Sequence, residues 1–128
     1  MMDNDRASQL RQKINEEIKN MQNLIVVAQE RSGILRASLY QRRRRCGREG
    51  CRCNQGKLHR DMALAVRSNG QSRLVCLTAM NLERARVLTA NYRRFRQARA
   101  EIVHTFGRVL KDFDTLGQLR RVKVQDIH

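Results

Sequence analysis

Residues 81–116 read NLERARVLTANYRRFRQARAEIVHTFGRVLKDFDTL, and this stretch decides the expected fold class. Steps of three and four residues separate ten positions in it without a slip, and only Arg99 among them is not apolar. The ten positions are Ala85, Leu88, Tyr92, Phe95, Arg99, Ile102, Phe106, Val109, Phe113 and Leu116. This heptad pattern predicts a long helix whose apolar side packs along a partner helix.

The N-terminal residues show the same periodicity. Within residues 5–31, apolar residues recur at steps of three and four, at Ala7, Leu10, Ile14, Ile18, Met21, Ile25 and Ala28. The pattern predicts a helix over 5–31 that folds back antiparallel along the helix over 81–116. Because the longer helix has more apolar surface than this partner can cover, we expect a second copy of the chain to cover the rest. The protein is therefore expected to be a homo-oligomer through the long helix.

The middle of the chain has a different character. Residues 46–79 hold all four cysteines and four of the seven glycines. The tract Ser68-Asn69-Gly70-Gln71 predicts a hairpin with a type I′ turn, with strands over 62–67 and 72–78. The expected fold class is mainly α: a single domain, 1–128, in which two long, antiparallel, coiled-coil-like helices flank a small zinc-binding β-hairpin module over 42–79. A basic tail, 117–128, follows the long helix.

Three cysteines and a histidine carry the clearest chemical signal. Cys46, Cys51, Cys53 and His59 are spaced C-x4-C-x-C-x5-H, and three thiolates with one imidazole suit a tetrahedral zinc ion. Cys76 is an alternative to His59 as fourth ligand, since the second hairpin strand could return it to the site. Neighbouring arginines (44, 45, 48 and 52) are expected to lower the thiol pKa values and favour the metal-binding thiolates.

A structural zinc is favoured over a catalytic one. A catalytic zinc keeps an open coordination position and needs a nearby general base. Glu49 and Asp61 are the only local acids, and no His-x-Glu or His-Glu-x-x-His arrangement is present. We therefore expect no enzymatic activity.

The composition favours a phosphate-rich partner. The 27 Lys and Arg residues outnumber the 12 Asp and Glu residues, which gives a formal charge of +15. Most of these cations are arginines, whose planar fork grips phosphate with two hydrogen bonds. No run of eighteen apolar residues and no apolar leader is present, so we expect a cytoplasmic protein with no membrane contact and with reduced thiols.

The nucleic-acid-binding candidates form two sets, one around the cysteines and one on the long helix. They are Arg42, Arg43, Arg44, Arg45, Arg48, Arg52, Lys57 and Arg60, and then Arg93, Arg94 and Arg96. They predict a salt-sensitive, sequence-independent contact with DNA or RNA. Two other interpretations stay open: a solvated charged face, and a coiled-coil adaptor that docks a larger protein without touching nucleic acid.

The cysteine motif also resembles an uncharacterised family of small prokaryotic proteins. The shared features are Ser38-Leu39, Cys46-Gly47-Arg48, Cys51-Arg52-Cys53, and then Gly56 and His59. The chain departs from the family's Gly-Pro-Tyr after the histidine, where it has Arg60-Asp61-Met62. The resemblance implies a zinc-type module between helices and an association with mobile elements, so that a recombinase or transposase is an expected partner.

Overall fold

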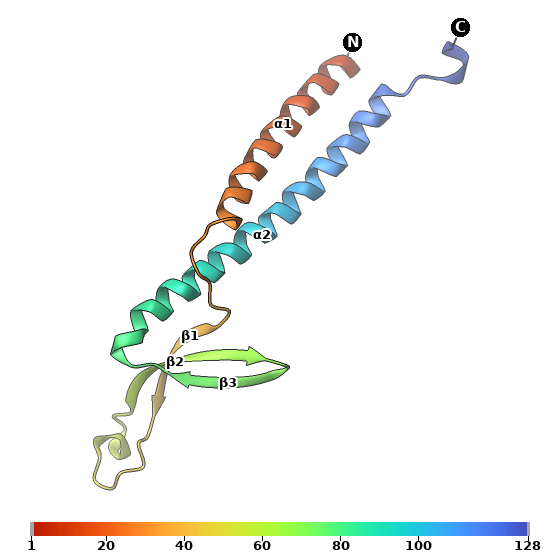
Figure 1. Cartoon of the computed structure of the whole chain (residues 1–128). Coiled ribbons are helices and arrows are strands. Elements are labelled where there is room, and N and C mark those ends of the chain that lie inside the picture. Colours follow the sequence, from red (N-terminus) through yellow and green to blue (C-terminus); the bar gives the residue numbers. More distant parts are fainter. Residues whose placement is uncertain (1, 128) are drawn as a thin grey trace. The chain divides into compact units, whose positions relative to one another are not determined.

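The computed structural model describes the backbone of residues 2–127 and the side chains of residues 4–127. Its order is α1 (Met2–Ala28), β1 (Ser38–Arg44), η1 (Arg52–Gln55), β2 (His59–Ser68), β3 (Gln71–Cys76), α2 (Ala79–Arg120) and η2 (Val124–Asp126), as Figure 1 shows. The chain divides into two units. The helical unit combines the residues up to Glu30 with those from Arg94 onwards, and the sheet unit is Arg31–Arg93.

The predicted fold class, mainly α with a β-hairpin, is wrong, because the sheet has three strands. They form an antiparallel sheet in the order β1-β2-β3. The missed strand is β1, SLYQRRR, which shows no alternation of apolar and polar residues. An edge strand with arginines can keep most of its side chains in solvent, so it needs no apolar face to form. The periodicity that identifies half-buried strands is therefore absent from it.

The register of the sheet places one end of it next to the cysteines. Residue pairs run from Ser38 opposite Ala65 to Arg44 opposite His59 between β1 and β2. β3 ends at Cys76, opposite Ala63, and the Leu77 N–H donates to the Met62 carbonyl, so residues 59–61 of β2 pair with β1 alone. The loop of residues 45–58 joins the two strands at this two-stranded end.

The turn between β2 and β3 has the backbone that its sequence demands. Asn69 has a φ of 53° and Gly70 a φ of 77°. Positive φ at both central residues defines a type I′ turn, which matches the twist of the flanking strands. Ser68 pairs with Gln71 directly beside the turn.

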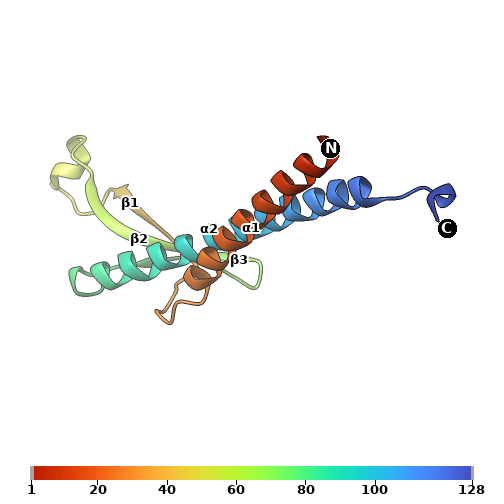
Figure 2. The ribbon, with the colours of Figure 1, turned by 90° about the horizontal axis from the view of Figure 1, so that it is seen from above.

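Two polar contacts define how the helices of the helical unit run. Near the middle of α1, Lys13 Nζ lies 3.4 Å from an oxygen of Asp112, and beyond the end of α1 an oxygen of Glu30 lies 2.8 Å from Arg94 Nη2. The partners on α2 run in the opposite sequence order, so the two helices are antiparallel. Figures 1 and 2 both show α1 alongside the C-terminal part of α2.

The side of α2 that is buried in this unit differs from the predicted stripe. Buried positions include Ala98, Thr105, Val109 and Asp112, and α1 contributes Ala7 and Ile14. Phe106 and Phe113 of the predicted stripe are 52% and 47% exposed. Ala98, Thr105 and Asp112 are buried, and each of them directly precedes a residue of the predicted stripe. Small side chains at these positions let two helices approach closely, which larger ones would prevent.

In the sheet unit, Ala63 and Leu64 of β2 and Ala85 of α2 are buried. Thr89 is also buried, and its hydroxyl donates to the Ala85 carbonyl at 2.8 Å. No helix within residues 2–127 combines the length and apolar character needed to cross a membrane.

Candidate metal centre and its basic surroundings

The four predicted ligands come together at the two-stranded end of the sheet. Cys46 follows β1, Cys51 is the N-cap residue of η1, and Cys53 lies within η1. His59 is the first residue of β2, opposite Arg44. The sheet register therefore fixes the two ends of the loop, and the short 3-10 helix brings the middle cysteines back toward them.

The distances in this cluster suit one tetrahedral metal ion. The ligating atoms of Cys46, Cys51, Cys53 and His59 all lie within 4.8 Å of one another. The Cys46 and Cys53 sulfurs are 3.6 Å apart, and Cys51 Sγ lies 3.2 Å from His59 Nε2. Metal–sulfur bonds of about 2.3 Å in a tetrahedron place two sulfurs about 3.8 Å apart. The donors therefore sit close to coordinating positions.

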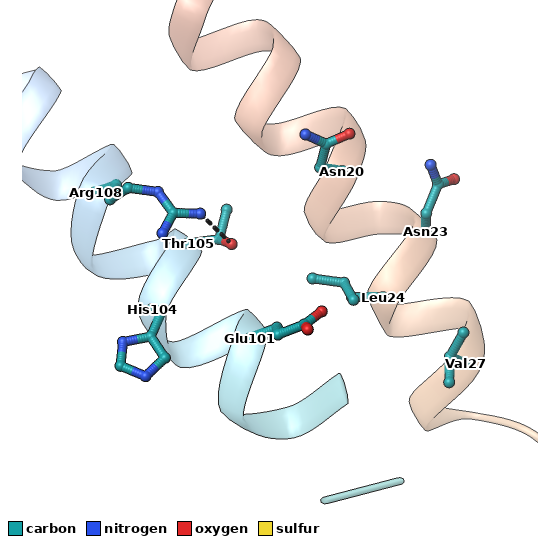
Figure 3. A pocket seen from close by; sticks show the side chains of 8 residues that line it. All are labelled: Asn20, Asn23, Leu24, Val27, Glu101, His104, Thr105 and Arg108. Atoms are coloured by element: carbon teal, nitrogen blue, oxygen red, sulfur yellow. Dashed lines mark hydrogen bonds between the residues drawn. The ribbon is translucent and has the colours of Figure 1, made fainter. Parts of the chain in front are cut away.

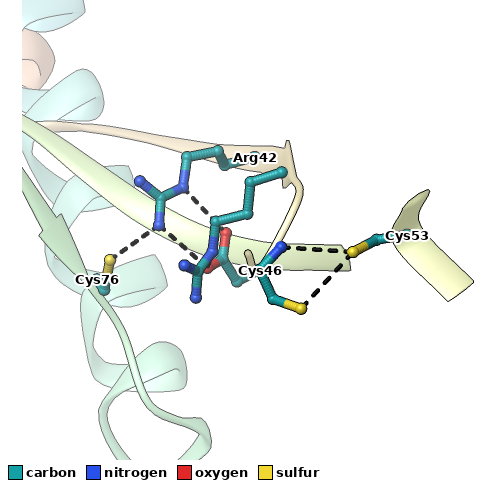
Figure 4. Close-up of polar contacts among 6 residues, drawn as sticks. Arg42, Cys46, Cys53 and Cys76 are labelled. Atoms are coloured by element: carbon teal, nitrogen blue, oxygen red, sulfur yellow. Dashed lines mark hydrogen bonds and ion pairs between the residues drawn. The ribbon is translucent and has the colours of Figure 1, made fainter. Parts of the chain in front are cut away.

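A backbone hydrogen bond to sulfur helps to hold Cys46 and Cys53 together. The backbone N–H of Cys46 donates to Cys53 Sγ at 3.4 Å, as drawn in Figure 4. Cys53 is completely buried, so this N–H replaces solvent as its donor. This hydrogen bond therefore ties the chain just after β1 to η1.

The pKa of the Cys46 thiol is lowered to about 6, chiefly because the backbone N–H of Arg48 donates to its sulfur and because Cys51 hydrogen-bonds to it. The backbone N–H of Cys53 also favours the thiolate of Cys51, but the thiols of Cys46 and Cys53 and partial burial outweigh it and raise the pKa of Cys51. We expected arginine side chains to lower the pKa of Cys46. The main cause is instead a backbone N–H donor. The side-chain pattern of the sequence does not show this donor, because every residue except proline carries a backbone N–H.

Cys76, the alternative fourth ligand, lies outside the cluster. It is exposed near the end of β3, and its sulfur lies 3.1 Å from Arg42 Nη2. Figure 4 shows Cys76 and the pair Cys46–Cys53 in separate places, with Arg42 beside Cys76. The structure thus gathers His59, and not Cys76, with the other three cysteines.

Within the run Arg42 to Arg45, only Arg42 and Arg44 bind an acidic side chain among residues 4–127. Arg42 forms two hydrogen bonds with the Asp61 carboxylate, both of 3.2 Å, and Arg44 Nε lies 3.0 Å from the same group. These contacts lower the pKa of Asp61, with the Arg42 hydrogen bond as the largest cause, and raise that of Arg42. Asp61 thus offsets charge on Arg42 and Arg44, a role that their separation in sequence concealed.

The remaining predicted cations around the cysteines have no acidic partner within residues 4–127. They are Arg43, Arg45, Arg48, Arg52, Lys57 and Arg60. A cavity of about 510 Å³ beside the cluster is bordered by three of its four members, Cys46, Cys51 and His59, and by Arg44, Arg48, Arg60 and Asp61. The site is therefore open to solvent on a side where cations predominate.

The second predicted basic set lies on α2. Arg94 binds Glu30 with two hydrogen bonds of 3.0 and 2.8 Å, so part of its charge is offset. Arg93 is exposed in the sheet unit, whereas Arg94 and Arg96 belong to the helical unit. Of the three, only Arg93 thus belongs to the same unit as the cysteine cluster.

A groove of about 640 Å³ lies in the helical unit between α1 and α2 (Figure 3). Leu24 and Val27 give it an apolar part, and Arg108 donates to the Thr105 hydroxyl at 3.0 Å within it. The other lining residues are Asn20, Asn23, Glu101 and His104. These residues offer amides and one imidazole at an open surface.

No protein-family model matches this chain, and neither a curated protein nor a solved structure is significantly similar to it. The resemblance to a prokaryotic family therefore rests on the motif residues alone.

Proposed function

We propose that Cys46, Cys51, Cys53 and His59 bind one zinc ion in a closed structural site. Three thiolates and an imidazole are ligands that zinc prefers, and four protein ligands complete a tetrahedron without an open position. The metal would hold the fourteen-residue connection between β1 and β2, residues 45–58, in which Cys53 alone is buried. A reducing cytoplasm would keep the thiols available.

We further propose that this zinc module binds nucleic acid through its cations. The observation that carries this proposal is the set of six cations around the cluster without an acidic partner among residues 4–127. Cations held on a sheet and a metal-bound loop lose less entropy on meeting phosphate than cations on a loose tail. Phosphate contacts position a protein without reading base sequence, so the proposed binding is sequence-independent.

The proposed role is that of a non-enzymatic accessory protein. Asp61, the acid that borders the cavity beside the cluster, is already held by Arg42 and Arg44, which leaves it poorly suited to act as a general base. By its resemblance to proteins associated with mobile elements, the chain would assist a recombinase or transposase on DNA.

The test is the salt dependence of binding. Fluorescence anisotropy with labelled duplexes of two unrelated sequences should give affinities that fall linearly on a log–log plot against salt, equally for both. DNA and RNA duplexes measured in parallel would identify the preferred polymer. No binding to either at low salt would reject this function and favour an adaptor that docks a protein.

A further inference from the structure

Arg43 and Arg60 lie directly opposite each other across β1 and β2. Like charges at opposed positions of an antiparallel pair destabilise a sheet. Neither arginine has an acidic partner within residues 4–127, although Asp61 follows Arg60 in the chain. Because side chains alternate along a strand, Asp61 faces Arg42 and Arg44 and leaves Arg43 and Arg60 on the other side.

The two arginines border a cavity with room for a small anion. Arg43 and Arg60 line a space of about 370 Å³ together with Lys57, Leu58 and Gly56. Arg60 also borders the cavity beside the cysteine cluster. Three cations thus surround one cavity whose lining contains no acid.

We propose that this cavity holds a backbone phosphate of the bound nucleic acid. The phosphate would relieve the repulsion between Arg43 and Arg60, and the two planar forks can each donate paired hydrogen bonds to its oxygens. The inference rests on the proposed function and narrows it. Of the four consecutive arginines, Arg43 makes the phosphate contact here, while Arg42 and Arg44 hold Asp61.

The test compares two double variants that remove equal charge from the same sheet. Arg43→Ala/Arg60→Ala empties the cavity of two cations, and Arg67→Ala/Arg73→Ala removes two exposed arginines outside it. Each phosphate contact contributes roughly 0.9 to the salt slope on duplex DNA. We expect the first variant to lower the slope by roughly two and the second to leave it nearly unchanged.

Equal slopes for the two variants would overturn the phosphate site while the proposed function stood. A parent chain that does not bind at all would reject both. Melting without nucleic acid supplies a second readout. Arg43→Ala/Arg60→Ala should melt at or above the parent's temperature, because a repulsive pair is removed, and a lower temperature would contradict the repulsion on which the site rests.

A second inference comes from α2 alone. Val103, Phe106, Leu110 and Phe113 are 59%, 52%, 46% and 47% exposed. They follow one another at steps of three, four and three, so they form one apolar stripe beside the α1-facing side of the helix. Both phenylalanines are larger than any apolar side chain that the helical unit buries within residues 4–127.

The symmetric spacing of the residues in this stripe suits a second copy of this chain as the partner. Its spacing reads the same in both directions, so an antiparallel copy would place Val103 near Phe113, and Phe106 near Leu110. Arg99 lies on the same side before the stripe and Asp114 lies after it, and neither has an ion pair within residues 4–127. An antiparallel copy brings Arg99 toward Asp114 at both ends, whereas a parallel copy would bring Arg99 toward Arg99.

We infer that two copies associate about a two-fold axis through this stripe, each stripe covering the other. The mass of the full chain in solution tests this, by sedimentation equilibrium. The parent chain should be a dimer and Phe106→Glu a monomer. Val26→Glu, a similar change at an exposed position of α1, should keep the parent's mass.

The charges at the stripe's ends give a readout that does not depend on the folding of Phe106→Glu. Asp114→Arg should weaken the dimer by roughly tenfold, and Arg99→Glu/Asp114→Arg should restore it. A monomeric parent, or a double variant no tighter than Asp114→Arg alone, would overturn the antiparallel pairing.

Discussion

Glu17 of α1 and Asp112 of α2 are two buried carboxyl groups that face each other inside the helical unit, each only 8% exposed. One oxygen of each, Glu17 Oε2 and Asp112 Oδ2, has no hydrogen-bond partner within residues 4–127. Burial, a hydrogen bond with Asp112 and its charge raise the pKa of Glu17 above its ordinary 4.5, although Lys13 and Arg108 oppose this. The buried Asp112 carboxyl beside it thus disfavours a charge on Glu17.

This pair predicts that Glu17→Gln stabilises the protein at neutral pH. Because the folded state raises the Glu17 pKa, it binds more protons than the unfolded state above pH 4.5. The resulting stabilisation is complete below the unfolded pKa and is lost as pH rises through the folded one. A neutral amide should therefore raise the free energy of unfolding at pH 7 by about 1 kcal/mol and flatten its pH dependence, both measurable by chemical denaturation.

Glu16→Gln is the matched control, since Glu16 is the exposed neighbour of Glu17. It should change stability by less than about 0.5 kcal/mol at every pH. Equal effects of the two substitutions would show that the carboxyl pair does not govern the pH dependence.

A large part of the fold can be predicted from local patterns in the sequence. The three- and four-residue spacing from Ala85 to Leu116 lies within α2, and Asn69-Gly70 makes the turn between β2 and β3. β1 could not be found in this way, because its stability comes from pairing with β2 and from Asp61. Such partners are distant in sequence, and so the fold class was wrong.

In the candidate site too, local spacing predicted some features, and pairing between distant strands determined the others. Ligand types and spacing predicted the cluster of Cys46, Cys51, Cys53 and His59, and these atoms do lie together. The choice of His59 over Cys76 depended on strand register, which spacing does not determine. Asp61 pairs with Arg42 and Arg44 because β1 lies beside β2. Since β1 was not predicted, these ion pairs were not predicted either.

Two glycines should respond in opposite directions to alanine. Gly70 has a φ of 77°, where a side chain costs about 1–2 kcal/mol. Gly107 lies within α2, and a Cβ there meets nothing within 4 Å. Gly70→Ala should lower the free energy of unfolding by about that cost, and Gly107→Ala should raise it by about 0.5–1 kcal/mol. A stabilising Gly70→Ala would contradict the type I′ turn.

Cysteine substitutions should separate the metal ligands from the cysteine outside the cluster. Cys51→Ser removes one of the four proposed ligands, and metal binding in small zinc modules is worth on the order of 10 kcal/mol. It should therefore lower the zinc content well below one per chain, measured by elemental analysis, and disorder loop 45–58. Cys76→Ser should keep both the zinc and the fold. If Cys76→Ser lost the metal and His59→Ala kept it, the ligand assignment would be reversed.

The central claim is that a zinc-held, basic sheet unit binds nucleic acid. The most direct measurement is the affinity of one preparation for a labelled DNA duplex at low salt, before and after the metal is removed by a chelator and after zinc is returned. We predict binding that is lost or strongly weakened on removal and restored by zinc. Equal affinity in all three states, or none in any of them, would contradict the claim.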